Sequence, residues 1–267
     1  MTPRLWQSGA VALTWEPEAG VRGKIVLLHG VIASANTWWQ TGPALAGRGW
    51  RVRAVDQAGH GASPAVGRPL SLELMADHVA DHVGTDIDLL VGHSLGAIVA
   101  LSFAATYPSR VRGLVLEDPP TGMHASNPGF AEWIAKDTAM ARTDPEGIAH
   151  REQVNNPSWR EDDVRHSIDA MARTDTEAVT AGLAGPLRWH LPDLVAAVDV
   201  PVLLLVAPVR DNGSALTGPD RVHLQRMLPA DRVIELDGGH CLHRDLPGEW
   251  VERIDAFAAS VVRTPVR

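Results

Sequence analysis

The residues of this chain best suited to covalent chemistry are one serine and one histidine that lie far apart in the sequence. Ser94 is the central residue of the pentapeptide Gly-His-Ser-Leu-Gly at positions 92–96. His240 follows two consecutive glycines near the carboxyl terminus. A histidine that titrates near neutral pH can take the proton of a serine hydroxyl and so make its oxygen nucleophilic. This pair therefore predicts nucleophilic catalysis through a covalent serine intermediate.

The residues around Ser94 predict a sharp turn from a strand into a helix. The apolar run Leu89–Val91 precedes the pentapeptide, and the apolar residues 97–101 follow it. Glycines two positions before and after the serine avoid collisions in such a turn, which lifts the hydroxyl out at the end of the strand. The helix directs its first free N–H groups toward the same point. We therefore interpret Ser94 as the nucleophile.

An upstream segment can supply donors for the negative charge that develops on a substrate oxygen during this chemistry. The apolar run Ile25–Leu28 ends in His29 and Gly30, and a loop follows. We predict that the backbone N–H groups of Val31 and Leu95 form an oxyanion hole. His29 is expected to order the loop and not to take part in the reaction.

The segment around His240 is interpreted as the loop that brings the general base to Ser94. A short apolar run, Val233–Leu236, leads into Asp-Gly-Gly and then His240. The glycines let the chain fold back, and the imidazole then acts as the base. His243 is the alternative base, which we interpret as structural. Cys241 is the single cysteine, so an internal disulfide is excluded.

Short apolar runs alternate with helical stretches along most of the chain, which predicts a mostly parallel sheet covered by helices on both faces. The first run is expected to form an antiparallel edge strand. The expected strands are Val11–Glu16, Ile25–Leu28, Arg51–Val55, Leu89–Val91, Leu114–Leu116, Val202–Val206 and Val233–Leu236. The expected helices between and after them are Ser71–Gly84, Leu95–Tyr107, Pro219–Leu228 and Pro247–Val262.

The alternation breaks between about residues 121 and 196, where strand-like runs are replaced by helical sequence. We interpret this segment as a helical cap over Ser94, inserted between core segments 1–120 and 197–267. Such a cap excludes water from the substrate and sets the shape of its pocket. Its expected helices are Phe130–Arg142, Pro145–Val154, Glu161–Ala172 and Thr176–Leu183.

Taken together, these segments resemble the α/β-hydrolase family, in particular its lidded serine esterases, lactonases and C–C bond hydrolases. The resemblance is carried by residues 27–30, 54–63, 91–96, 107–116, 200–205 and 239–240. It implies an α/β-hydrolase fold with a mostly parallel central sheet, flanking helices and an inserted helical cap. It also implies the catalytic order serine, acid, histidine, with no cofactor and no metal.

The resemblance leaves three carboxylates open as the acid of the triad. The usual position after the strand Val202–Val206 falls on Arg210, and a loop one residue longer would bring Asp211 there. Some relatives take the acid from the end of the preceding core strand, where this chain has Glu117 and Asp118. In each case the carboxylate accepts the Nδ1–H of the histidine and fixes its tautomer.

The chain has nine tryptophans and one tyrosine, which favours an apolar, aromatic pocket. Gly30, Trp38 and Trp189 are the residues expected to contact substrate. The leading interpretation is hydrolysis of a carboxylic ester or lactone through an acyl-Ser94 intermediate. A C–C bond hydrolase, an acyltransferase or a perhydrolase would use the same residues, and a ligand-binding receptor with little turnover is the alternative from another class. Related dehalogenases and epoxide hydrolases carry aspartate at the position of Ser94.

Charge and hydropathy along the sequence limit which binding partners and which cellular location we expect. The 267 residues carry a net charge of −8 without a basic patch, which argues against nucleic acid. The amino terminus lacks a signal pattern, and no apolar run approaches the ~20 residues of a membrane span. We therefore expect a cytoplasmic protein with a small ester or lactone as substrate, acting as a monomer or a small homo-oligomer. Only two residues are lysine among 24 basic side chains, which suggests a GC-rich bacterial genome.

Overall fold

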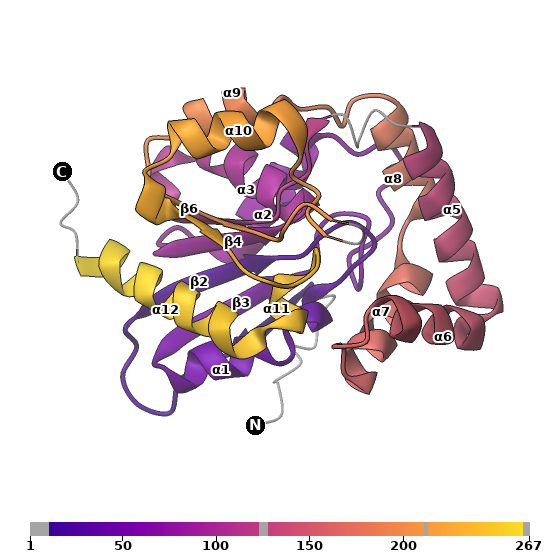
Figure 1. The fold of residues 1–267 in the computed structure, drawn as a ribbon, viewed down its shortest axis with the longest axis horizontal. Helices are drawn as coiled ribbons and strands as arrows, with labels where there is room; N and C mark the ends of the chain where they lie inside the picture. Colours follow the sequence, from indigo (N-terminus) through magenta and orange to yellow (C-terminus); the bar gives the residue numbers. More distant parts are fainter. Residues whose placement is uncertain (1–10, 123–127, 211–212, 264–267) are drawn as a thin grey trace.

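The computed structural model describes residues 11–122, 128–210 and 213–263. These residues are built around one sheet with the strand order β1-β3-β2-β4-β5-β6-β7 (Figure 1). All neighbouring strands are parallel except β1, which pairs antiparallel with β3 at the edge. Both the predicted sheet and its antiparallel edge strand are therefore confirmed. The strands are β1 (Ala12–Trp15), β2 (Gly23–Leu28), β3 (Trp50–Val55), β4 (Leu89–His93), β5 (Leu114–Glu117), β6 (Val202–Val206) and β7 (Val233–Glu235).

The central strands β4 and β5 bring two candidate residues to the same edge of the sheet. Every residue of both strands is buried, as their nearly continuous apolar sequences require when helices cover both faces. In the parallel register His93 lies opposite Glu117. Ser94 and Asp118, the next residues along each strand, therefore emerge side by side at the carboxyl ends.

Helices cover both faces of the sheet (Figure 1). Helix α3 (Leu95–Thr106) is enclosed on almost every side, which explains why its sequence lacks a polar face. Among the described residues, three helices were not expected from the sequence, namely α1 (Thr41–Gly47), α9 (Leu191–Ala196) and α11 (Leu242–Asp245). On one face lie α1 (Thr41–Gly47), α11 (Leu242–Asp245) and α12 (Pro247–Arg263), and on the other lie α2 (Leu72–Val83), α3 (Leu95–Thr106), α9 (Leu191–Ala196) and α10 (Gly218–Met227). Short 3-10 helices occupy η1 (Ala35–Trp38), η2 (Pro108–Arg110) and η3 (Ala230–Arg232).

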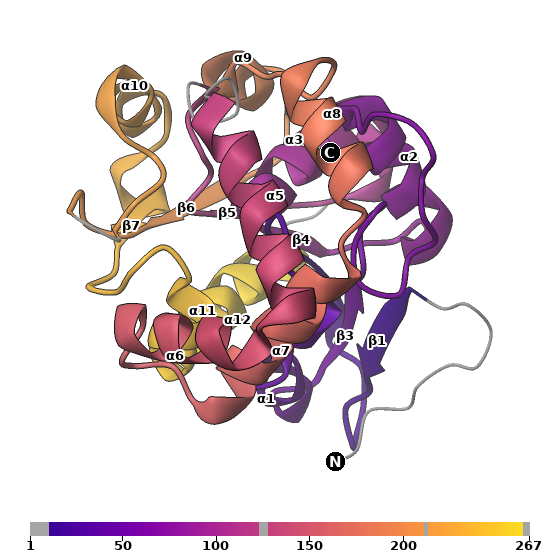
Figure 2. The ribbon, with the colours of Figure 1, turned by 90° about the vertical axis from the view of Figure 1, so that its right-hand side faces the viewer.

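Four further helices lie between β5 and β6 in the sequence and stand at one side of the sheet (Figures 1 and 2). They pack on one another, and their bounds follow the four helices predicted for this segment. Helix α9 behaves differently, because it packs on α3 and α10 in the layer that covers the sheet. The four helices are α5 (Pro128–Thr143), α6 (Pro145–Asn155), α7 (Glu161–Arg173) and α8 (Thr176–Ala184).

The loops that follow β2 and β3 are tied together by His29. Its Nδ1–H donates to the carbonyl oxygen of Gly30 over 2.7 Å, and its Nε2 accepts from the backbone N–H of Gln57 over 3.0 Å. Burial lowers the pKa of His29 to about 4, so the ring is neutral, as this pair of bonds requires. His29 therefore orders the loop that leads to Val31.

None of the helices in the described part of the chain has both the length and the apolar composition needed to span a membrane.

Candidate active site

Ser94 occupies a strained turn between β4 and α3. Its backbone has φ 52° and ψ −121°, a region that non-glycine residues rarely adopt. A Cβ on Gly92 would collide with the carbonyl oxygen of Gly96, and a Cβ on Gly96 would collide with that of Leu28. The turn is held by a 2.9 Å hydrogen bond from the Ser94 N–H to the carbonyl oxygen of Glu117. The Gly-x-Ser-x-Gly spacing is thus a steric requirement of this turn.

Two backbone N–H groups beside Ser94 are free to bind an oxyanion. Val31 and Leu95 both line the cavity that Ser94 faces. Neither N–H has a hydrogen-bond partner among the residues that the structure describes, and Leu95 is the first residue of α3, where such groups are normally unpaired. Gly30 keeps this region open, because a Cβ there would lie 3.2 Å from the Cβ of Ser94.

His240 is paired with Asp118. Its Nδ1 lies 2.6 Å from the Oδ2 of Asp118, which is fully buried, whereas the imidazole remains 33% exposed. Burial lowers the pKa of His240, but the hydrogen bond and the negative charge of Asp118 outweigh burial and raise this pKa above its ordinary value. Ser94 and His240 line the same cavity. Their side chains are not hydrogen-bonded to each other, a contact that in catalytic sites often tightens only when substrate binds.

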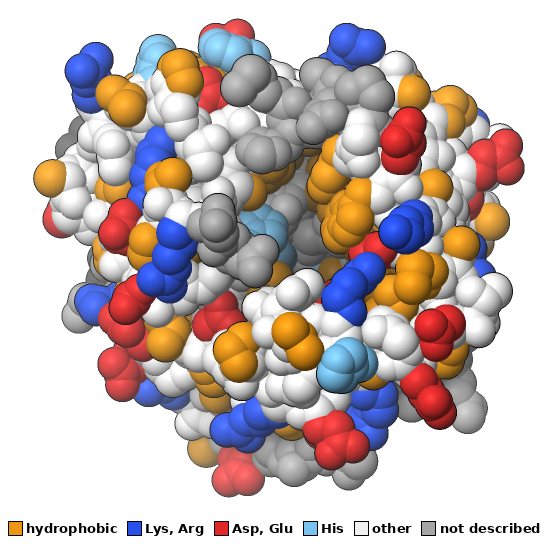
Figure 3. All heavy atoms as spheres, turned by 45° about the vertical axis from the view of Figure 1, so that its right-hand side comes forward, with side chains coloured by type: hydrophobic (Ala, Val, Ile, Leu, Met, Phe, Trp, Pro, Cys, Tyr) orange, Lys and Arg blue, Asp and Glu red, His pale blue; other side chains and the backbone are white. Residues whose placement is uncertain are grey.

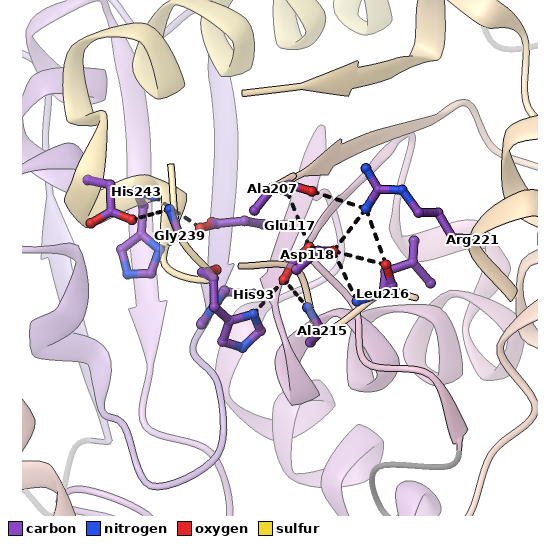
Figure 4. Close-up of polar contacts among 12 residues, drawn as sticks. His93, Glu117, Asp118, Ala207, Ala215, Leu216, Arg221, Gly239 and His243 are labelled. Carbon is purple, nitrogen blue, oxygen red and sulfur yellow. Dashed lines mark hydrogen bonds and ion pairs between the residues drawn. The ribbon is translucent and has the colours of Figure 1, made fainter. Parts of the chain in front are cut away.

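The carboxylate of Asp118 is supported by the loop that follows β6 (Figure 4). Its Oδ2 accepts from the N–H of Ala215 over 2.7 Å, and its Oδ1 accepts from the hydroxyl of Ser214 and the N–H of Ala207. The guanidinium of Arg221 in turn donates to the Ser214 oxygen over 3.0 Å. These donors fix the orientation of the Asp118 carboxylate and hold it in line with the histidine.

Of the three carboxylates left open by the sequence, Asp118 is the one bonded to His240. Asp211 lies outside the described residues. Glu117 faces away from Asp118 toward His243 (Figure 4), whose Nδ1 lies 2.7 Å from its Oε1, and the indole of Trp250 donates to its Oε2 over 2.9 Å. Burial raises the pKa of Glu117 to about 7. Two consecutive acidic residues are thus hydrogen-bonded to two different histidines.

Three buried side chains near this pair, His93, Glu117 and His243, have ligand atoms within 4.8 Å of one another, a spacing that can hold a metal ion. Each of the three side chains already has a hydrogen-bond partner within the protein. The Nε2–H of His93 donates to the carbonyl oxygen of His240 over 3.0 Å, and the Nε2 of His243 is 2.7 Å from the hydroxyl oxygen of Thr37. Hydrogen bonds to other described residues therefore hold all three side chains in place.

Ser94 and His240 open into a cavity of about 290 Å³ between the sheet and the inserted helices. Figure 3 shows a hollow in this face, with a histidine visible inside it and hydrophobic side chains along one wall. Trp189 lies in the wall, and its indole N–H donates to the carbonyl oxygen of Pro120 over 3.1 Å. The inserted segment also contributes Phe130, Trp133, Trp159, Met171 and Leu183.

The prediction that Trp38 contacts substrate is wrong. Its side chain is fully buried and does not line the cavity. The ring packs instead against His243, at a centroid distance of 4.3 Å, and against Trp250, at 5.5 Å. The short helix η1 turns this tryptophan inward toward α12. Trp38 therefore contributes to packing behind the active site and not to the cavity wall.

Sequence reasoning missed Arg244, which also lines the cavity. It belongs to α11 and lies four positions after His240. A helical turn after the histidine loop is the signal that could have placed its side chain at the site.

Comparisons with known proteins agree with this geometry. A model of the alpha/beta hydrolase family matches residues 25–254. The chain is 29% identical over 249 residues to a pimeloyl-[acyl-carrier protein] methyl ester esterase of Neisseria meningitidis. The aligned region covers 88% of this chain and 91% of that protein. The chain is also 29% identical over 259 residues to a putative 2-succinyl-6-hydroxy-2,4-cyclohexadiene-1-carboxylate synthase of Bacillus subtilis, with 89% and 90% covered.

A solved structure shows the same fold. A thermophilic esterase from Thermogutta terrifontis superimposes with a TM-score of 0.71 at 24% identity, covering 94% of each chain. The family match extends over the serine turn, the inserted helices and the histidine loop. The chain therefore belongs to the alpha/beta hydrolase family.

Proposed function

We propose that this protein is a serine hydrolase that cleaves a carboxylic ester or a lactone through an acyl-Ser94 intermediate. The observation that carries the proposal is the convergence of a strained serine, a carboxylate-paired histidine and two unpaired N–H groups on one cavity. His240 takes the proton of Ser94, and the Ser94 oxygen attacks the carbonyl carbon. The N–H groups of Val31 and Leu95 hold the resulting oxyanion.

The second half of the reaction uses the same groups. The imidazolium of His240 protonates the leaving alkoxide, and the C–O bond breaks to leave Ser94 acylated. His240 then removes a proton from water, which attacks the acyl carbon and releases the carboxylic acid. Asp118 accepts the Nδ1–H throughout and stabilises the imidazolium. With a lactone the leaving alcohol stays tethered, so water must compete with its return.

Similarity to a methyl ester esterase supports an ester as substrate. The apolar cavity walls favour a substrate with an acyl chain or ring and disfavour a strongly hydrated group, because apolar surfaces gain most from excluding water.

We infer that the core comprises residues 1–120 and 197–267 and that the inserted segment 121–196 carries the cap. Within that segment, α5 to α8 are the helices that cover Ser94, since α9 packs on the core.

Hydrolysis of short and medium p-nitrophenyl esters and of a lactone panel tests this proposal, with wild type beside Ser94→Ala. The expected result is turnover by wild type and a loss of roughly 10³-fold to 10⁶-fold in Ser94→Ala, because the nucleophile is removed. Equal activity in both proteins would contradict an acyl-serine mechanism. If both are inert toward every ester and lactone, simple ester hydrolysis is the wrong reaction for this site.

A further inference from the structure

A buried cation, Arg244, forms part of the wall of the same cavity, and no described carboxylate lies within ion-pair distance of it. Its side chain is only 4% exposed and lines the cavity. Its guanidinium forms no ion pair with any described Asp or Glu, and its two hydrogen bonds go to hydroxyl oxygens. An isolated charge is costly to remove from water. A guanidinium in this position therefore calls for an anion from outside the chain.

The guanidinium is held in a fixed orientation by neutral groups. Its Nε donates to the hydroxyl oxygen of Thr37 over 2.9 Å, and its Nη1 donates to that of Ser167 over 2.7 Å. The guanidinium carbon, Cζ, lies over the ring of Trp159, 4.3 Å from the ring centroid. Its remaining nitrogen, Nη2, makes no hydrogen bond in the described part of the chain and is not among the fully enclosed unpaired atoms. This nitrogen is available to a ligand.

The core of the protein reinforces that orientation. The Thr37 oxygen accepts from Arg244, so its own proton points to the Nε2 of His243, 2.7 Å away. The opposite nitrogen of His243 then carries the proton that it donates to Glu117 over 2.7 Å. This series of hydrogen bonds fixes each donor in advance. Little conformational entropy therefore remains to be lost when an anion binds.

Carboxylates of the protein near this end of the cavity are already occupied by other donors. None is within ion-pair distance of Arg244 in the described residues, so the charge remains for a ligand. Asp163 accepts from Trp39 and Gln40, Asp245 accepts from Ser158 and Trp159, and Glu152 accepts from Arg151 and Asn156.

We propose that Arg244 binds a free carboxylate of the substrate, so that the substrate is an ester or lactone that bears a carboxylate away from the bond to be cleaved. A guanidinium forms strong charge-assisted hydrogen bonds with carboxylates. One free nitrogen among apolar walls, with Glu152 also in the lining, suits a singly charged carboxylate better than a doubly charged phosphate. This inference rests on the proposed hydrolase function and specifies its substrate class.

The test compares matched pairs of esters in wild type, Arg244→Gln and Arg244→Lys. One set carries the carboxylate in the acyl part, as phenyl half-esters of linear dicarboxylic acids, and another carries it in the alcohol part, as acyloxy carboxylic acids. Each compound is paired with its methyl-capped neutral counterpart. In at least one set, wild type is expected to favour the carboxylate form by about tenfold to a hundredfold in kcat/KM. Arg244→Gln should abolish that preference, and Arg244→Lys should keep part of it.

Arg142→Gln is the matched control for loss of a structural arginine. The Arg142 guanidinium donates to the carbonyl oxygens of Ala172 and Thr174 and does not line the cavity. This variant should lower Tm while leaving the preference for the carboxylate substrate unchanged. Arg244 is structural only, and the inference is overturned, if wild type shows no such preference or if Arg244→Gln slows charged and neutral esters equally.

A binding measurement separates this inference from the proposed reaction. Calorimetry with Ser94→Ala and with the double variant Ser94→Ala/Arg244→Gln uses the same half-esters and acyloxy acids as probes. If no ester is hydrolysed by wild type, the proposed reaction fails, yet binding weakened at least tenfold by the loss of Arg244 still supports the carboxylate site. Equal affinity in the two variants, or no binding to either, overturns it.

Discussion

Asp118 Oδ2 lies 2.6 Å from His240 Nδ1, so the carboxylate bonded to the histidine comes from the end of β5. The loop after β6 contributes to this pair from the other side, because the N–H of Ala215 and the hydroxyl of Ser214 both donate to Asp118. The backbone of Asp118 has φ 44°, a strained value for an aspartate that the surrounding bonds maintain. The carboxylate is therefore held in place before any substrate arrives.

This pairing predicts different results for two aspartates. Asp118→Asn should lower kcat by roughly 10⁴-fold, because an amide cannot stabilise the imidazolium and favours the wrong tautomer. Asp211→Asn should change kcat by about twofold at most, because Asp118 already accepts the Nδ1–H of His240. Steady-state kinetics with one p-nitrophenyl ester measures both, with thermal melting as the control for folding. The opposite ranking would assign the acid to Asp211.

The pH dependence of kcat/KM should report the raised pKa of His240. The base is active only when neutral, so activity is lost as the pH falls through this pKa. Since Asp118 holds the pKa above the ordinary 6.5, the acidic limb should lie above pH 6.5. In Asp118→Asn burial, which lowers the pKa, remains the largest influence, ahead of the charges of Glu117 and Asp245. The limb of the residual activity should therefore move to lower pH. An unchanged or upward-shifted limb would show that Asp118 does not set this pKa.

Glu117 is expected to act on stability. Glu117→Ala removes the acceptor for the His243 ring, its backbone N–H and the Trp250 indole, and it leaves these buried donors unpaired. The free energy of unfolding should fall by roughly 3–5 kcal/mol, as measured by urea denaturation. Trp250→Phe removes one of these donors and should cost less. A large loss of kcat in Glu117→Ala with unchanged stability would instead make Glu117 the acid.

Substitutions of Trp38 and Trp189 should distinguish a tryptophan that packs in the core from one that contacts substrate. Trp38→Leu leaves a void between His243 and Trp250, and large-to-small changes of this kind cost roughly 2–5 kcal/mol of stability. Trp189→Leu alters the cavity wall, so KM for a medium-chain ester should change severalfold with a smaller loss of stability. The assignment fails if Trp38→Leu alters the chain-length preference while Trp189→Leu does not.

The parts of the site that the sequence predicts are those whose geometry is local. Gly92 and Gly96 are required by collisions within a few residues of Ser94, so the turn can be read from the pentapeptide. The alternating apolar runs likewise define the strands and their order along the chain.

The remaining features depend on contacts between distant segments. Nothing local distinguishes Glu117 from Asp118, because the choice depends on which side of β5 meets the histidine loop. The direction of the Trp38 ring is set by α12, more than 200 positions away. Whether Arg244 has a counter-charge depends on residues from η1 and α7, which the sequence does not bring together.

The most direct test of the central claim is labelling with a fluorophosphonate, which reacts with activated serines whatever the natural substrate. Intact-mass and peptide mass spectrometry would locate the adduct in wild type, Ser94→Ala and His240→Gln. The proposed mechanism predicts one adduct per chain on the peptide that contains Ser94, none in Ser94→Ala and a strongly slowed reaction in His240→Gln. An unlabelled wild type, or an adduct on another residue that persists in Ser94→Ala, would contradict it.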